Sequence, residues 1–175
     1  MRQRRPDFLL ILSVAAIVFA ADQLTKSWVR NSLTLGVPWD PVPWLTPILS
    51  FTHVTNRGAA FGMLPQLASV FPLITVAVCA LMFYLYLPLT KGRPLATLSL
   101  GLQLGGTLGN LADRLMRQGW VTDFLDLNFW PLQDWPVFNI ADSSVVVSVC
   151  VLAVVLLLEK EPAQIQSPEP LQPPE

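Results

Sequence analysis

The sequence predicts an all-α polytopic membrane protein with four transmembrane helices, and its composition is the first reason. Of 175 residues, 53% are hydrophobic and only 13% are charged, and the mean hydropathy is +0.51. This composition excludes a disordered chain and is unusual for a soluble domain. The second reason is that four stretches reach the length of about 20 mostly apolar residues that a bilayer-spanning helix needs. They lie at about residues 8–28, 67–89, 95–113 and 138–158, in a single integral membrane domain of residues 1–160.

The first stretch has two possible interpretations. Three arginines precede an uncharged run of 14 residues, from Phe8 to Ala21, that ends in small side chains. A basic start, a short apolar run and small residues are also the plan of a cleavable signal peptide. The run continues through Asp22 to Trp28 to reach spanning length, so we expect a first transmembrane helix. An intact amino terminus in the mature protein distinguishes the two.

The other three stretches differ in how polar they are. The second carries no charge. The third is uncharged as far as Leu111 but contains Gln103, Thr107 and Asn110, and the fourth has Asp142 as its single charge. Ionisable groups within spans are costly and usually mark function, which directs attention to the last two helices.

The orientation follows from basic residues beside the spans, because basic flanks stay in the cytoplasm. These residues are Arg2, Arg4, Arg5, Lys91, Arg93 and Lys160. They place both termini and the loop between the second and third spans on the cytoplasmic side. Residues 29–66 and 114–137 are then the outer-face segments. The proline-rich tail, residues 161–175, cannot bury a core, so we expect a disordered cytoplasmic extension.

The outer-face segments have the composition of a membrane surface. All six tryptophans lie in or beside them: Trp28, Trp39, Trp44, Trp120, Trp130 and Trp135. Indole rings anchor at the level of the lipid headgroups, so we expect an amphipathic lid segment lying on the membrane. Four prolines between residues 38 and 47 forbid a long helix there, while residues 50–56 (SFTHVTN) have strand-like content and predict a small sheet.

Composition also excludes several kinds of chemistry. The 11 Lys and Arg against 12 Asp and Glu leave no basic excess, so nucleic acid is not an expected partner. His53, the single histidine, cannot form a two-histidine zinc motif, and no metal or other cofactor is expected. There is no Gly-x-Ser-x-Gly elbow, and a Ser–Lys pair would draw on Lys26, Lys91 or Lys160 alone. We interpret His53 as a polar residue of the outer sheet rather than a catalytic base.

Two carboxylates remain, at matched depths in the membrane. Asp113 ends the third span and Asp142 begins the fourth. At 1.5 Å per residue from the inner end, they stand about 27 Å and about 24 Å along their helices. Antiparallel neighbouring helices can bring such groups face to face near the outer surface.

The surroundings of the two acids are also alike. Asn110 precedes Asp113 by three residues, and Asn139 precedes Asp142 by three. On a helix this spacing puts each amide on nearly the same face as its acid. A stripe of small residues leads to Asp113 at four-residue steps: Gly101, Gly105 and Gly109. Such a stripe lets a helix or an extended peptide approach closely.

Plainer interpretations of these residues stay open. Asn139 can be a helix N-cap, with Asp142 an acid in the first turn that the helix dipole favours. Asp113 can simply pair with Arg114 or Arg117, and the glycines can only pack helices. Paired intramembrane acids can also carry protons or ions in a small transporter, or merely stabilise helix ends in a scaffold.

A pair of adjacent carboxylates has a distinctive chemistry. Two close carboxylates do not both ionise easily, so they share one proton. One then acts as a base for water and the other as an acid toward a peptide carbonyl and the leaving amine. The sequence therefore favours aspartic peptide hydrolysis.

Four segments, in order and each beside a span, resemble the lipoprotein signal peptidases, also called prolipoprotein or type II signal peptidases. They are Asp22-Gln-Leu-Thr-Lys26, Asn56-Arg-Gly-Ala-Ala-Phe-Gly62, Gly105-Gly-Thr-Leu-Gly-Asn-Leu-Ala-Asp113-Arg114 and Phe138-Asn-Ile-Ala-Asp142. The resemblance runs from the first span through the fourth and leaves out the tail.

The resemblance implies a metal-independent intramembrane aspartic endopeptidase of the bacterial cytoplasmic membrane, with four transmembrane helices and a small outer-face β-cradle. Its substrates are diacylglyceryl-modified prolipoprotein precursors, cut just before the lipid-bearing cysteine. Membrane lipids are further partners, and globomycin-type cyclic peptides are inhibitors. The resemblance gives Asp113 and Asp142 the catalytic roles. Residues that bind substrate or support the site are Asn56, Gly58, Asn110, Arg114, Asn139, Asp22 and Lys26.

Overall fold

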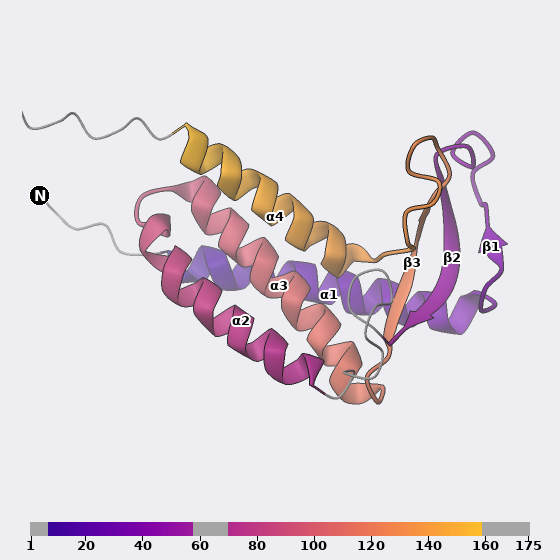
Figure 1. Cartoon of the computed structure of the whole chain (residues 1–175), viewed down its shortest axis with the longest axis horizontal. Helices are drawn as coiled ribbons and strands as arrows, with labels where there is room; N and C mark the ends of the chain where they lie inside the picture. The colour runs from indigo at the N-terminus through magenta and orange to yellow at the C-terminus, as the bar shows by residue number, and fades with distance from the viewer. Residues whose placement is uncertain (1–6, 58–69, 159–175) are drawn as a thin grey trace, which may run out of the picture.

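The computed structural model describes residues 7–57 and 70–158, which form a helical bundle with a small sheet at one end (Figure 1). The elements are α1 (Phe8–Ser32), β1 (Pro38–Trp39), β2 (Leu49–Asn56), α2 (Phe71–Tyr86), the 3-10 helix η3 (Leu87–Thr90), α3 (Pro94–Met116), β3 (Val121–Leu127) and α4 (Ile140–Leu157). Gly58, the arginines that precede the first span, Lys160, residues 161–175 and part of the predicted lid lie outside the described residues.

Three helical segments of the described chain are long and apolar enough to cross a membrane: Phe8–Ser32, Phe71–Thr90 and Ile140–Leu157. They correspond to the first, second and fourth predicted spans. The helix α3 corresponds to the third and is also long enough, with 23 residues. Its glycines and polar side chains make it less apolar than the others, so length and composition identify three of the four predicted spans among the described residues.

The helix α3 lies at the centre of the bundle. It packs directly against both α1 and α4. The contact with α4 agrees with the expectation that the third and fourth spans are antiparallel neighbours. Glycines allow this close approach: a Cβ added at Gly105 would lie 2.7 Å from the Ala15 carbonyl oxygen of α1. A Cβ at Gly106 would lie 2.5 Å from the Ala141 carbonyl oxygen of α4. Both distances are too short for any side chain, which explains why these positions are glycine.

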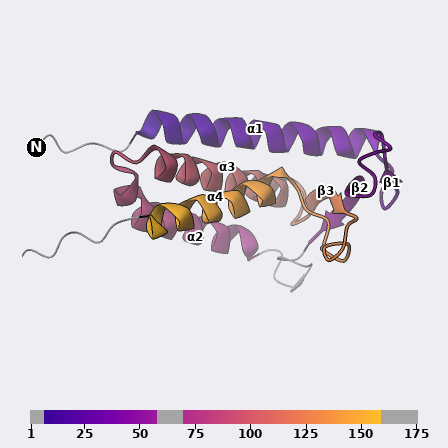
Figure 2. The ribbon, with the colours of Figure 1, turned by 90° about the horizontal axis from the view of Figure 1, so that it is seen from above.

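The helix α1 is the longest element and reaches the sheet. Its 25 residues extend about 37 Å, more than the roughly 30 Å of a bilayer core. Figure 2 shows α1 running past the ends of the other helices to the strands. The last turn of α1 contacts β3, and Val29 is fully buried. The helix thus continues for one turn beyond Trp28, the predicted end of the first span, and this turn packs on the sheet.

The sheet joins the two predicted outer-face segments. Its strand order is β1-β2-β3, all antiparallel, with Leu49 opposite Leu127 and Asn56 opposite Val121. The strand expected over residues 50–56 is confirmed as β2. The strand β3, which comes from the second segment, was not predicted. This pairing carries Asn56 to the beginning of β3, beside the buried end of α3.

Exposed aromatic side chains surround the sheet. The Trp28 and Trp39 rings are 5.3 Å apart, and Trp39 is 5.9 Å from Phe51. Trp44 and Trp130, in the connecting loops, are largely exposed. The sheet end of the molecule therefore presents indole rings outward.

Candidate functional site

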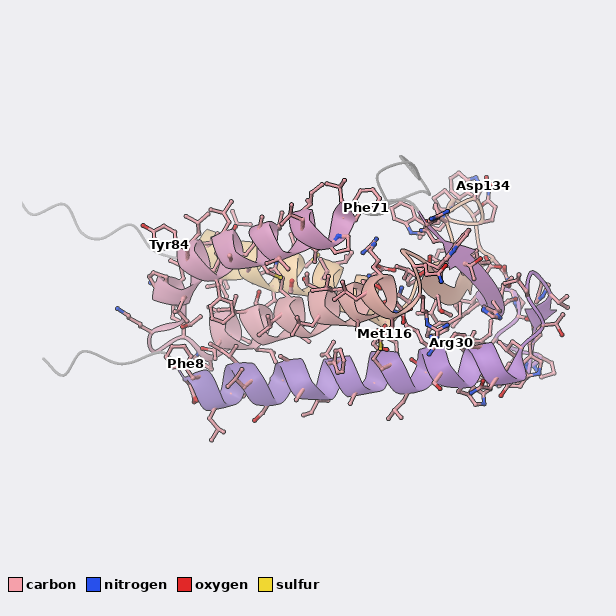
Figure 3. The ribbon with its side chains drawn as sticks, turned by 90° about the horizontal axis from the view of Figure 1, so that it is seen from below. Phe8, Arg30, Phe71, Tyr84, Met116 and Asp134 are labelled. Atoms are coloured by element: carbon pink, nitrogen blue, oxygen red, sulfur yellow. The ribbon has the colours of Figure 1, made fainter. Side chains whose placement is uncertain are left out.

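Charged side chains gather where the end of α3, the start of α4 and β3 meet α1. The carboxylates are Asp22, Asp113, Asp123 and Asp142, and the cations beside them are Lys26, Arg30, Arg114 and Arg117. Figure 3 shows Arg30 on α1 near the end of α3 that Met116 marks. Burial of so many charges requires that each be paired or hydrogen-bonded.

Asp142 is held by the start of its own helix. Its Oδ2 accepts a hydrogen bond from the Asn139 backbone N–H at 3.2 Å, and the Asn139 Oδ1 accepts one from the Asp142 N–H at 2.9 Å. This reciprocal arrangement is a capping box. Asp142 Oδ1 also accepts a bond from Asn110 Nδ2 of α3 at 2.7 Å. The N-cap interpretation of Asn139 is therefore confirmed, and the cap fixes the Asp142 carboxylate against α3.

Asp113 has different partners. It is fully buried, and its Oδ2 accepts a hydrogen bond from the Thr122 backbone N–H at 3.0 Å. The same oxygen is 3.6 Å from Lys26 Nζ, and Oδ1 is 3.6 Å from Arg30 Nη1 and from Arg117 Nε. The interpretation that Asp113 pairs with Arg117 is thus confirmed.

The predicted face-to-face meeting of Asp113 and Asp142 is not among the contacts of the described residues. The reason is the direction in which each side chain leaves its helix. Asp113 continues the stripe of Gly101, Gly105 and Gly109, and these glycines face α1. Equal distances along two helices give two residues the same depth in the membrane, but they do not determine the direction around the helix axis in which each side chain points. Asp113 therefore points at α1, whereas Asp142 points at Asn110.

The carboxylate that interacts with Asp142 is Asp123 of β3. Asp123 is 3% exposed, and its Oδ1 accepts a hydrogen bond from Asn139 Nδ2 at 2.6 Å. Burial, and then the negative charge of Asp142, raise the pKa of Asp123 to about 7, although hydrogen bonds from Asn139 and Asn56 oppose this change. Asn139 thus serves both acids, because its amide side chain binds Asp123 and its backbone N–H binds Asp142.

Asp123 was missed in the sequence because no strand was expected around it. The available signal was that Val121 and Leu125, two residues before and after Asp123, are apolar. In a strand with one buried face, Asp123 would turn inward with them.

Lys26 contacts the Asp22 and Asp113 carboxylates directly and reaches Asp142 through Asn110. It is fully buried, and its Nζ is 2.7 Å from Asn110 Oδ1 and 2.8 Å from Asp22 Oδ2. Its third partner is Asp113, described above. Asn110 accepts from Lys26 and donates to Asp142, so the orientation of this amide is fixed.

Asp22 supports the start of α4. Its Oδ1 accepts a hydrogen bond from the Ala141 N–H at 3.0 Å, at the helix N-terminus where an acid is favourable. A Cβ at Gly109 would lie 2.5 Å from Asp22 Oδ2, so glycine leaves the space that this carboxylate fills.

The remaining predicted site residues join the same cluster where the structure describes them. Arg114 interacts electrostatically with Asp113, Asp123 and Asp142, and its guanidinium lies 5.4 Å from the Phe71 ring of α2. Asn56 reaches Asp123 from β2. Gly58 lies outside the described residues.

His53 lies in β2, where its Nδ1 is 3.2 Å from the Leu33 carbonyl oxygen. Within residues 7–57 and 70–158, no group of three His, Cys, Asp or Glu side chains is arranged to hold a metal ion. The described cluster is therefore one of carboxylates, amides and fixed cations.

Comparisons with known proteins agree on one family. The family model described as signal peptidase (SPase) II matches residues 14–158. The chain is 44% identical to the lipoprotein signal peptidase of Moorella thermoacetica, over 91% of this chain and 98% of that protein. It is 39% identical to the lipoprotein signal peptidase of Bacillus subtilis, over 86% and 95% respectively.

A solved structure extends the agreement to the fold. A bacterial membrane enzyme with 28% sequence identity superposes with a TM-score of 0.79, covering 90% of this chain and 93% of that one. The family model spans most of the chain, and the relatives match over nearly their whole length. The chain therefore belongs to the signal peptidase II family of membrane peptidases.

Proposed function

We propose that this protein removes the signal peptide from diacylglyceryl-modified prolipoproteins, cutting before the lipid-bearing cysteine, and that Asp123 and Asp142 are its catalytic dyad. The observation that carries the dyad is the shared residue Asn139, which binds both carboxylates in a buried site where they interact electrostatically. Asp113, for which the sequence predicted a catalytic role, lies instead among fixed cations. The proposal therefore replaces Asp113 by Asp123.

One proton is held between the two acids at neutral pH. Two adjacent buried carboxylates do not both ionise easily. Hydrogen bonds from Asn110 and the Asn139 backbone, together with the start of α4, stabilise negative charge on Asp142. The proton accordingly resides on Asp123, whose pKa is about 7.

Hydrolysis then uses each acid twice. Asp142 takes a proton from water as the water oxygen attacks the scissile carbonyl carbon, and Asp123 gives its proton to the carbonyl oxygen. When the resulting diol collapses, Asp142 protonates the leaving amine and Asp123 recovers a proton from a diol hydroxyl. The products are a signal peptide with a new carboxylate and a lipoprotein whose amino terminus is the lipid-bearing cysteine.

We further propose that α3 is a fourth transmembrane helix in a single domain of residues 1–160. Both termini and the tail, residues 161–175, are cytoplasmic, and the site faces the outer side of the bacterial inner membrane. The basic flanks and the exposed indoles around the sheet support this orientation.

The lipid accounts for much of the substrate preference in this proposal. Burying an acyl chain contributes about 0.8 kcal/mol per CH2 and keeps the scissile bond near the membrane surface. Membrane lipids surround the described helices, and globomycin-type inhibitors occupy the substrate position. Asn56, Asn110 and Arg114 interact directly with the two acids, and Lys26 and Asp22 support Asn110 and the start of α4.

The test is cleavage of a diacylglyceryl-modified precursor by purified protein in detergent. We expect Asp123→Asn and Asp142→Asn each to lower kcat by about 10^2- to 10^4-fold, as for loss of an acid or base. The matched control is Asp126→Asn on the same strand, where the carboxylate accepts a bond from Thr52 Oγ1. Near wild-type cleavage by Asp123→Asn contradicts the dyad. A transporter would show pH-dependent flux without cleavage, and a scaffold would show neither.

A further inference from the structure

Asp113 takes no part in the proposed hydrolytic steps, yet it is one of the most completely buried charges in the described chain. Its carboxylate faces Lys26 and Arg30 from α1 and Arg117 from α3, and Arg114 also interacts with it. Burying a carboxylate is costly unless charged partners and hydrogen bonds compensate for the lost water. An acid kept in such surroundings without a chemical step of its own has to act through its neighbours.

The neighbour that links Asp113 to the dyad is Thr122. Asp113 Oδ2 accepts the N–H of Thr122, the residue immediately before Asp123. The Thr122 hydroxyl accepts a bond from Arg30 Nη1 at 3.2 Å. Because successive side chains of a strand point to opposite faces, fixing Thr122 also fixes the direction in which Asp123 leaves β3.

Asp113 also holds the turn that leads into β3. The Arg117 N–H donates to the Asp113 carbonyl oxygen at 2.8 Å, while the Arg117 side chain approaches the Asp113 carboxylate. The turn then passes through Gln118 and Gly119, whose φ values of 55° and 92° are left-handed. One residue therefore bonds to both sides of the turn, through its backbone on α3 and through its side chain on β3.

The same carboxylate is coupled to the charge around the dyad. Lys26 interacts electrostatically with both Asp123 and Asp142, and Asp22 and Arg114 are the other charged groups facing the pair. Asp113 partly neutralises Lys26, Arg30 and Arg117. Its negative charge therefore reduces the positive potential that Lys26 exerts at the dyad.

We propose that Asp113 is a positioning residue, which anchors the start of β3 so that Asp123 faces Asn139 and whose charge sets the pH range over which the dyad keeps its single proton. This inference rests on the proposed function. It differs from a catalytic role because Asp113 touches neither water nor substrate in the reaction. It differs from a purely structural role because its charge, and not only its shape, affects turnover.

The test compares two charge changes of opposite sign in one cluster. Asp113→Asn keeps an acceptor for the Thr122 N–H but removes a negative charge. We expect kcat to fall by about 10- to 100-fold, from imperfect placement of Asp123. The alkaline limb of the kcat–pH profile should move down by about 0.5 pH unit, since the remaining cations favour the ionised dyad.

Arg117→Gln is the second variant and removes a positive charge from a partly exposed side chain. We expect this variant to keep the fold and to change kcat by less than about threefold. The alkaline limb should move up by about 0.3 pH unit, because the negative charge of Asp113 is then less compensated. The shift is smaller than for Asp113→Asn because the Arg117 side chain lies in a higher dielectric. Both variants and Asp126→Asn are assayed as full-length protein in detergent, with kcat and KM measured across the neutral range. If Asp113→Asn does not fold, the direction of the shift in Arg117→Gln decides the proposal.

Several outcomes overturn the inference. Folded Asp113→Asn that cleaves at no pH, as Asp123→Asn does, makes Asp113 catalytic. If the alkaline limb of the kcat–pH profile stays at its wild-type position in the folded variants, the role of Asp113 is purely structural. Neither outcome touches the dyad, which fails separately if Asp123→Asn cleaves like the wild-type protein.

Discussion

The two sides of α3 are packed very differently. Toward α1 and α4, glycines allow backbone contact, and the interface ends in the buried Lys26 network. Toward α2, the packing is sparse, and α2 buries none of its own side chains. A site that must hold carboxylates in fixed positions needs close packing of the kind that α3 makes with α1 and α4. A helix with few buried contacts can separate from its neighbours at a lower free energy. Under the proposed function, this would suit the side on which a lipid-anchored peptide approaches.

The largest expected effect on stability comes from Lys26→Met, at the close-packed interface. The variant leaves Asp22 and Asp113 buried without their shared cation, and removing one member of a buried pair costs about 3–5 kcal/mol. Denaturation in mixed micelles measures the change. The control is Lys91→Met, an exposed lysine that should change the unfolding free energy by less than about 0.5 kcal/mol.

A small-to-large substitution tests the same contrast through packing alone. Gly105→Leu forces α1 away from α3, because even a Cβ would lie 2.7 Å from a backbone oxygen; we expect a loss of about 1–3 kcal/mol. Ala77→Leu, on the exposed surface of α2, should be close to neutral. Equal losses in the two variants, measured by the same denaturation, would show that α2 is packed as closely as α1.

The pH dependence of stability probes the close-packed side without changing its shape. The unfolded Asp123 releases its proton near pH 3.8, whereas the folded protein keeps it until about pH 7. Between these values the folded state binds more protons, so raising the pH lowers stability across this window. We expect Tm in detergent to fall as pH rises from 4 to 7, and less steeply in Asp123→Asn. An unchanged slope in that variant assigns the dependence to another group.

The smallest expected effect lies on α2. Leu81→Ala removes a side chain that is 56% exposed in the isolated chain and should change the unfolding free energy by less than about 0.5 kcal/mol. Leu152→Ala, on α4, removes a side chain that is 8% exposed and should cost about 2 kcal/mol or more. A large loss for Leu81→Ala would abolish the contrast between the two sides.

The helices were predictable because uncharged apolar runs leave few alternatives. The strand β2 was predictable from its content and from the prolines before it. The strand β3 was not, because Asp123 and Asp126 interrupt its apolar pattern, and only pairing with β2 makes the segment extended. Tertiary contacts of this kind override local sequence preference.

Most members of the site were predictable from the sequence, but Asp123 and the pairing of the acids were not. The resemblance identified Asn110, Asn139, Asp22 and Lys26, and all of them lie in the cluster. Counting residues along the helices gave Asp113 and Asp142 the same height. It could not give their azimuth, which depends on α1 packing against the glycine stripe.

The capping of α4 by Asn139 has a consequence for biogenesis. Asn139 caps α4, the last helix of the described residues, and Asp142 lies in its first turn, whereas Asp123 precedes both in the chain. Under the proposed assignment, a partly synthesised chain has one acid of the pair and no asparagine to orient it. The peptidase therefore stays inert throughout its own insertion, and it acquires activity only when its final segment is threaded into the bilayer.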